Sequence, residues 1–120
     1  MEPIYENNLI RVEIESSEVP WLKIFSQESY KEFVDAPEHI KKEILRVMDI
    51  ISKEMIEFYQ PDKINIASFG NYLPHLHWHV MARFENDSYF PEPVWGSKQR
   101  KGSYRLENFD EFVDIIKRKV

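Results

Sequence analysis

The chain has 120 residues, of which 42% are hydrophobic and 14% aromatic, and this composition predicts one globular domain, residues 1–120, and not a disordered chain. The absence of cysteine excludes disulfides and thiolate metal sites, and no apolar run is long enough for a membrane span. A formal net charge of −5 argues against binding of long nucleic acid, and the N-terminus lacks the pattern of a secretory signal, so we expect a cytoplasmic protein.

The first half of the chain is expected to form two strands and a long helix. Residues 9–15 alternate apolar and polar side chains and residues 21–25 are mostly apolar, which predicts a pair of antiparallel strands. Asp35, with Pro37 shortly after it, is typical of a helix start. An amphipathic helix that ends near Pro61 is predicted from apolar residues at helical spacing. These residues are Ile40, Ile44, Val47, Ile51, Met55 and Phe58.

Two further strands are expected in the second half. Residues 63–67 form the first of them, and the loop 69–74 after it contains a Gly-Asn turn signal. The next strand extends from about His75 to Phe84. A connection rich in proline and aromatic residues, 89–96, follows it.

The chain is expected to end in a second amphipathic helix. Asn108 begins this helix, and Glu111 is placed to act as its reciprocal cap. The apolar stripe of the helix consists of Phe109, Phe112, Val113 and Ile116. The resulting order of elements, β-β-α-β-β-α, indicates an α+β domain with sequential antiparallel strands.

Three of the four histidines fall within five residues of one predicted strand. Because side chains alternate between the two faces of a strand, His75, His77 and His79 share a face. The other face is apolar and is expected to pack in the core. It consists of Leu76, Trp78, Val80, Ala82 and Phe84. One strand thus supplies a core face and three imidazoles, which act as nucleophiles, proton donors or metal ligands near neutral pH.

Polar residues near this strand extend the predicted site. If Ile64 and Ile66 face the core, Asn65 lies on the histidine face by parity, where its amide can hold a phosphate oxygen. A surface or turn-stabilising role for Asn65 is the alternative. Arg83 has the same parity as the histidines, but its position at the strand end favours solvent. The basic stretch 98–101 is either a solvated loop or a patch that steers polyphosphate.

Strand geometry limits what the three histidines can do together. Alternate residues are about 6.6 Å apart, so the outer imidazoles, about 13 Å apart, cannot both bind one zinc ion at about 2.0–2.1 Å. Two neighbours can, with a carboxylate or with His39, which we expect to be exposed on the long helix. A purely structural row of histidines is disfavoured. Attack on phosphorus by a neutral imidazole is favoured, because neighbouring imidazoles disfavour one another's protonation.

Residues 75–81 match, at every position, the motif His-φ-His-φ-His-φ-φ of the histidine triad (HIT) family, where φ is apolar, and the chain resembles that family. Gly70 stands five residues before the first motif histidine, as is usual there. Residues 82–84 and 90–96 resemble a bacterial branch often described as diadenosine tetraphosphate hydrolase-like. The resemblance implies an α+β fold with an antiparallel β-meander sheet, one long amphipathic helix and a C-terminal helix. It also implies a homodimer.

The activity that this resemblance implies is nucleotidyl chemistry at an α-phosphate. The enzyme would be a hydrolase or nucleotidyltransferase acting on a nucleoside phosphate ester, phosphoramidate or dinucleoside polyphosphate. By motif position, His77 is the nucleophile that becomes nucleotidylated. His79 contacts the phosphate or bridging oxygen and assists protonation of the leaving group, and His75 orients the constellation.

Nucleotide contacts are assigned by the same resemblance to three other residues. Asn65 and Asn71 position phosphate oxygens, and Gly70 lets the backbone approach. No metal is expected in the protein itself, although a polyphosphate substrate can bring Mg²⁺. Trp21 stands where many family members carry a fourth histidine after a proline, which puts the role of His75 in question. A nucleotide-binding module with little catalysis is therefore an alternative, as is a metal site built on two histidines.

Overall fold

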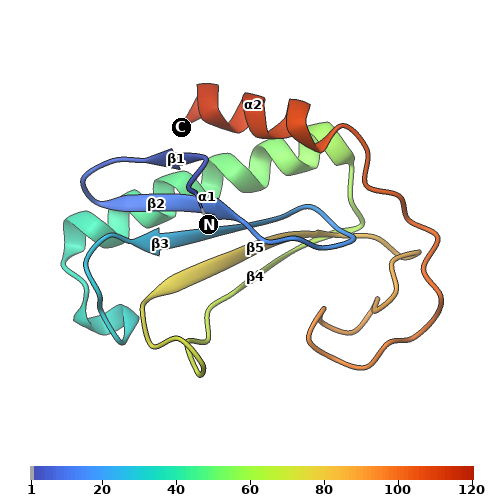
Figure 1. Cartoon of the computed structure of the whole chain (residues 1–120), viewed down its shortest axis with the longest axis horizontal. Helices are drawn as coiled ribbons and strands as arrows, with labels where there is room; N and C mark the ends of the chain where they lie inside the picture. Colours follow the sequence, from blue (N-terminus) through green and yellow to red (C-terminus); the bar gives the residue numbers. More distant parts are fainter. Residues whose placement is uncertain (1) are drawn as a thin grey trace.

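The computed structural model describes residues 2–120, in which five strands form one antiparallel sheet (Figure 1). The elements are β1 (Tyr5–Glu6), β2 (Ile10–Ile14), β3 (Trp21–Ser26), the 3₁₀ turn η1 (Phe33–Asp35), α1 (Glu38–Tyr59), β4 (Lys63–Ala67), β5 (His77–Arg83) and α2 (Phe109–Lys119). The strand order is β1-β2-β3-β5-β4. Sequential strands pair within β1–β2–β3 and within β4–β5, and β5 lies beside β3. The predicted α+β class is confirmed.

Both helices lie on one face of the sheet (Figure 1). α1 contacts β2, β3 and β5, and α2 packs on α1. The predicted core face of the histidine strand is confirmed, because Leu76, Val80, Ala82 and Phe84 are buried and Trp78 packs half-buried against them. Among the described residues, neither helix is long and apolar enough to cross a membrane. Within residues 2–120 the opposite face of the sheet carries no helix, and His77 and His79 lie on that face.

The limits of several strands differ from the prediction: β2 is one residue shorter at each end, and β3 ends one residue later. β5 begins two residues later and ends one residue earlier than expected, so His75 and Phe84 flank it. The two-residue strand β1 was not predicted, because two residues are too few to show a period. β4 has the predicted limits. The registers Ile64–Ala82 and Ile66–Val80 confirm that these isoleucines share the face of the core residues, although Ile66 is 46% exposed at the sheet edge.

The helix caps were predicted less well than the helices. Asp35 does not cap α1, because its carboxylate accepts a hydrogen bond from the Glu32 backbone N–H within η1 (3.2 Å). Pro37 precedes the first helical residue instead. Asn108 precedes α2 as predicted, but its backbone is left-handed (φ 57°) and its side chain makes no capping hydrogen bond. The reciprocal cap between Asn108 and Glu111 is therefore wrong.

Candidate active site

His77 is the first residue of β5, and its ring is held from two sides. Its Nδ1 lies 2.7 Å from the backbone oxygen of His75. Because a carbonyl oxygen only accepts hydrogen bonds, Nδ1 carries the proton, and Nε2 of the neutral ring keeps its lone pair. Phe25 of β3 stacks on the imidazole, with ring centroids 4.8 Å apart and 17° between the planes. The ring therefore has a fixed orientation and one free basic nitrogen.

His79 lies two residues further along β5, with its ring centroid 5.0 Å from that of His77. Its Nδ1 accepts a hydrogen bond of 3.0 Å from the indole Nε1–H of Trp21 on β3. Burial, together with smaller effects of the nearby His77 and Lys23, lowers the pKa of His79 to about 4, although Glu15 acts in the opposite direction. His79 is therefore neutral at physiological pH.

His75 precedes β5 and is half-buried. Its Nε2 donates a hydrogen bond of 2.6 Å to the backbone oxygen of Ser26, and its backbone oxygen accepts the bond from His77. Trp21 was expected to put the role of His75 in question more than that of His77, but the structure pairs Trp21 with His79. The reason is the register: Trp21 lies opposite Met81, so its indole is diagonal to His79 and far along the strand from His75.

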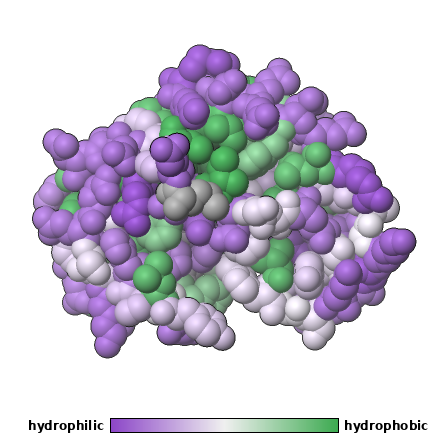
Figure 2. Space-filling model, viewed as in Figure 1, coloured by the Kyte–Doolittle hydropathy of each residue, from purple (hydrophilic) through white to green (hydrophobic). Residues whose placement is uncertain are grey.

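A cleft of about 400 Å³ lies next to two of the three histidines. His77 and His79 line it together with the loop 69–73 and Trp95. In the space-filling view, the lower outline is notched between the two loops that reach below the sheet in Figure 1 (Figure 2). The Trp95 ring contacts the ring of Phe69 at a centroid distance of 4.9 Å, and that of His79 at 4.9 Å. Aromatic side chains thus form much of the cleft wall.

Two of the predicted nucleotide contacts line this cleft with the histidines. Gly70 has φ 77°, a left-handed conformation that side chains disfavour, and a Cβ there would lie 3.3 Å from the backbone oxygen of Leu73. Asn71 follows it and is exposed. The structure therefore brings His77, His79, Gly70 and Asn71 to one cavity.

Asn65 lies on the histidine face of β4, opposite Met81, as parity predicted. Its Oδ1 accepts a hydrogen bond of 2.9 Å from Nη1 of Arg83. Asn65 lines a neighbouring cleft of about 340 Å³, which shares Phe69 and Trp95 with the histidine cleft. Asn65 is therefore on the predicted face but does not line the histidine cleft itself.

Arg83 was expected in solvent, and this expectation is wrong, because it is only 1% exposed. It forms a bidentate ion pair with Asp87, from Nε to Oδ2 at 2.9 Å and from Nη2 to Oδ1 at 3.0 Å. Burial alone would raise the pKa of Asp87, but Arg83 and the backbone N–H groups of three residues lower it to about 2. These residues are Phe84, Tyr89 and Phe90. The i, i+4 spacing of Arg83 and Asp87 predicts a pair only within a helix, and Arg83 ends a strand, so the sequence contained no signal for the pair.

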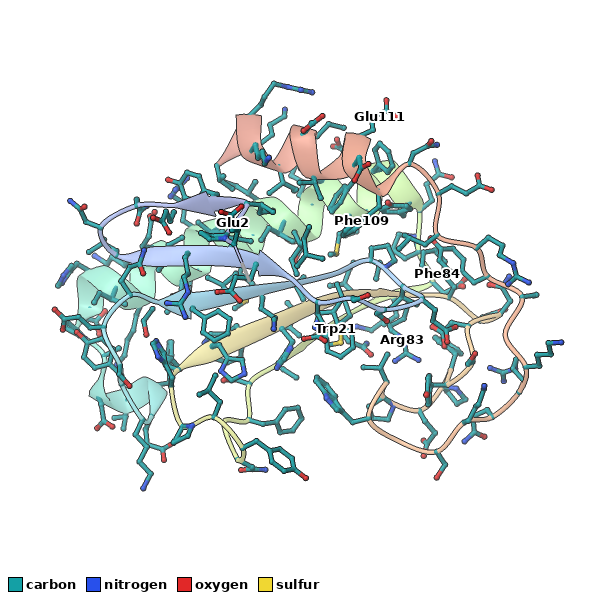
Figure 3. The ribbon with its side chains drawn as sticks, in the orientation of Figure 1. Glu2, Trp21, Arg83, Phe84, Phe109 and Glu111 are labelled. Carbon is teal, nitrogen blue, oxygen red and sulfur yellow. The ribbon has the colours of Figure 1, made fainter. Side chains whose placement is uncertain are left out.

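This ion pair fixes the start of the loop that carries Trp95. Trp21 and Arg83 both lie below the sheet, on the face away from the helices, whereas Phe109 lies above it beside α2 (Figure 3). Arg100, from the basic stretch 98–101, donates Nη1 hydrogen bonds to the backbone oxygens of Asp87 (2.8 Å) and Phe90 (2.7 Å). Arg100 of the basic stretch therefore connects the two ends of the loop 87–100 by hydrogen bonds.

The histidine nitrogens are partly committed within the protein. Nε2 of His75 and Nδ1 of His77 and His79 take part in the hydrogen bonds above. Of the remaining ring nitrogens, Nε2 of His77 and Nε2 of His79 belong to the two histidines that line the cleft, so these two are placed for a ligand. Within residues 2–120, no group of three or more His, Cys, Asp or Glu side chains is arranged to hold a metal ion. His39 is exposed on α1, as predicted.

Comparison with known proteins identifies the family. Residues 4–86 match the family model of the HIT domain, so the chain belongs to the HIT domain family. Members of this family generally bind nucleotides, and the family includes nucleotide hydrolases and transferases as well as proteins that only bind. No protein of curated function matches the chain.

Solved structures with a similar fold are also histidine triad proteins. One from Bradyrhizobium japonicum is 28% identical, with a TM-score of 0.81, over 99% of this chain and 90% of that chain. One from Sinorhizobium meliloti is 26% identical, with a TM-score of 0.79, over 98% and 88%. A third, from Marinobacter aquaeolei, is 27% identical, with a TM-score of 0.74, over 98% and 84%.

Proposed function

We propose that this protein is a nucleotide hydrolase or nucleotidyltransferase that attacks the α-phosphate of a nucleoside phosphate ester, phosphoramidate or dinucleoside polyphosphate. The observation that carries the proposal is the state of His77. Its Nδ1 proton is committed to the His75 backbone oxygen, which leaves the Nε2 lone pair free at a cleft. A neutral imidazole with a free nitrogen is a nucleophile toward phosphorus.

The reaction proceeds in two displacements. In the first, Nε2 of His77 forms a bond to the α-phosphorus, and the bond from phosphorus to the leaving group breaks. The leaving group departs with that electron pair and takes up a proton, while His79 is hydrogen bonded to the bridging atom or to a phosphate oxygen. In the second, water or another acceptor hydroxyl attacks phosphorus and loses its proton, and the P–N bond breaks with its electron pair returning to His77.

Three residues contact the phosphate in this proposal. The Gly70 backbone and the Asn71 amide hold oxygens of the α-phosphate in the histidine cleft, because both residues line it. Asn65 contacts a phosphate oxygen of the substrate part that extends past Trp95 into the neighbouring cleft. The protein itself supplies no metal, and any Mg²⁺ arrives with a polyphosphate substrate.

The family resemblance also leads us to propose a substrate class, an oligomeric state and a location for the protein. Residues 82–84 and 90–96 favour the branch described as diadenosine tetraphosphate hydrolase-like, and with it a dinucleoside polyphosphate substrate. We propose a homodimer in the cytoplasm. Support for the dimer comes from β4, which among residues 2–120 pairs only with β5 and exposes 46% of Ile66, because such an edge strand can pair with a second copy.

A trapping experiment tests the role of His77. Wild type, His77→Ala and His39→Ala are incubated with diadenosine tetraphosphate or adenosine phosphoramidate and quenched. Mass spectrometry then detects an AMP adduct of about 329 Da on the peptide that contains residues 75–81. We expect the adduct and AMP release in wild type and in the exposed-histidine control His39→Ala, and neither in His77→Ala. Undiminished turnover in His77→Ala would refute the nucleophilic role.

The two alternatives predict other outcomes. A binding module would bind AMP in calorimetry but give neither adduct nor turnover across the substrate panel. A metal site built on two histidines would show stoichiometric metal, or zinc uptake, in protein purified without a histidine tag, and His79→Ala would abolish the uptake.

A further inference from the structure

The hydrogen bond between Trp21 and His79 has one possible direction. An indole Nε1–H only donates, so Nδ1 of His79 must be the acceptor and cannot carry a proton. A neutral imidazole has one proton, which is then on Nε2. An imidazolium has protons on both nitrogens and cannot accept this bond at all. The contact therefore selects one of the three states that a histidine side chain can take.

We propose that Trp21 is a positioning residue that holds His79 as the neutral tautomer protonated on Nε2. His77 is held in the opposite tautomer by the His75 backbone oxygen. Adjacent imidazoles thus offer complementary groups at one cleft: a lone pair on His77 Nε2 and an N–H donor on His79 Nε2. This inference rests on the proposed function only in the use that the N–H donor serves, namely a hydrogen bond to the phosphate or bridging atom.

Packing makes the Trp21 indole a rigid donor. Trp21 is 9% exposed and His79 is 8% exposed, so water competes little for this bond. The indole is also in edge contact with the His79 ring, at a centroid distance of 5.5 Å, and with Trp95 at 5.2 Å. Its backbone position is fixed by the pairing of β3 with β5, where Trp21 lies opposite Met81.

The titratable and charged groups around His79 lie on β5, on β3 and directly after β2. His77 is on β5, Lys23 on β3 lies directly opposite His79, and Glu15 follows β2. Lys23 forms an ion pair with Glu15, with 2.9 Å between Nζ and Oε1, so the opposing effects of these two charges on His79 partly cancel. Burial and the Trp21 hydrogen bond then both favour the neutral ring.

Tryptophan differs from histidine at this position in a way that matters for the reaction. A histidine in place of Trp21 would titrate near neutral pH, and it could donate or accept depending on its own tautomer. An indole neither gains nor loses a proton in the physiological range. Trp21 therefore maintains the donor state of His79 at every pH where the protein is folded and His79 is neutral.

Imidazole nitrogen NMR tests the inference without any substrate. Long-range proton–nitrogen spectra of ¹⁵N-labelled protein distinguish the two tautomers, and His79→Asn identifies the His79 signals by their disappearance. We expect wild-type His79 to be protonated on Nε2 at pH 7. Trp21→Phe should lose this tautomer preference, and the pKa of His79 should rise in that variant. Trp95→Phe is the matched control, because Trp95 touches the same ring without a hydrogen bond, so the tautomer should not change.

Turnover of adenosine phosphoramidate gives the second readout. Losing one neutral hydrogen bond in Trp21→Phe should lower kcat by about 2- to 10-fold, with a smaller change in KM. A proton on Nδ1 of His79 in wild type would overturn the inference, and this result does not depend on whether the variant folds. An unchanged tautomer in folded Trp21→Phe would overturn it as well. A protein without nucleotidyl transfer, but with a Trp21-dependent His79 tautomer, would refute the proposed function and leave the control of His79 by Trp21 standing.

Discussion

Replacing Arg83 by methionine tests how much the buried ion pair at the start of the Trp95 loop contributes to the stability of the domain. Arg83 and Asp87 are 1% and 0% exposed, and removing one partner of such a pair costs about 3–5 kcal/mol. The pKa of Asp87, about 2 against an ordinary 3.8, corresponds to about 2.5 kcal/mol of stability at neutral pH. Backbone N–H donors to Asp87 remain in the variant, and Asp87 can take up a proton. We therefore expect a loss of about 3 kcal/mol.

Urea unfolding at pH 7 and 25 °C, followed by circular dichroism, measures this loss. Arg46→Met is the matched control, since the Arg46–Glu43 ion pair is exposed at the arginine and is expected to contribute about 0–1 kcal/mol. In wild type, the folded pKa of Asp87 lies below its unfolded value, so its contribution is complete above about pH 4 and is lost as pH falls toward 2. If Arg83→Met and Arg46→Met destabilise the protein equally, the ion pair does not have the assigned role.

Three further predictions concern the loop after β5 and the two histidines of the cleft. Gly102→Ala places a Cβ 2.6 Å from Oγ and 2.7 Å from the backbone N of Ser88, so urea unfolding should show a loss of about 1–3 kcal/mol, and an unchanged midpoint would contradict this packing. Phe25→Leu removes the ring that stacks on His77, and steady-state assays should give a kcat roughly tenfold lower, unless the stacking does not orient the nucleophile. The free energy of unfolding should fall by up to about 3 kcal/mol as pH decreases from about 6.5 to 4, because His79 takes up a proton at higher pH in the unfolded chain than in the folded protein. A pH series of unfolding curves should show this fall in wild type but not in His79→Asn.

Side-chain alternation was sufficient to predict both faces of the histidine strand. The hydrophobic effect leaves one register for an amphipathic strand, because a shift of one residue would turn the imidazoles toward the core under the helices and the apolar row away from it. The same argument placed Asn65 correctly, since residues opposite one another in a pair of antiparallel strands share a face. Features that repeat with the period of the strand could therefore be predicted from the chain alone.

The partners of the histidines could not be predicted in this way. Trp21 and His79 are separated by 58 residues, and their contact depends on the register between β3 and β5. That register joins two strands that are far apart in the sequence, and no local pattern in the sequence encodes it. The prediction that Arg83 lies in solvent was wrong for a related reason. A charged residue at the end of a strand is usually solvated, and only the fold of the following loop brings Asp87 next to Arg83.

The face of β5 that lies away from the helices buries three polar side chains, His77, His79 and Arg83, and each would be costly there without a partner. Their partners come from a backbone oxygen, from β3 and from the loop after β5, so the reacting groups are ordered by the same contacts that stabilise the domain. Two residues of the cleft wall, Tyr72 and Leu73, differ from these buried groups because they are exposed. They can therefore be substituted without disturbing the buried hydrogen bonds. Substitutions there should therefore alter substrate preference, whereas substitutions among the buried polar groups should alter the chemical step and the stability together.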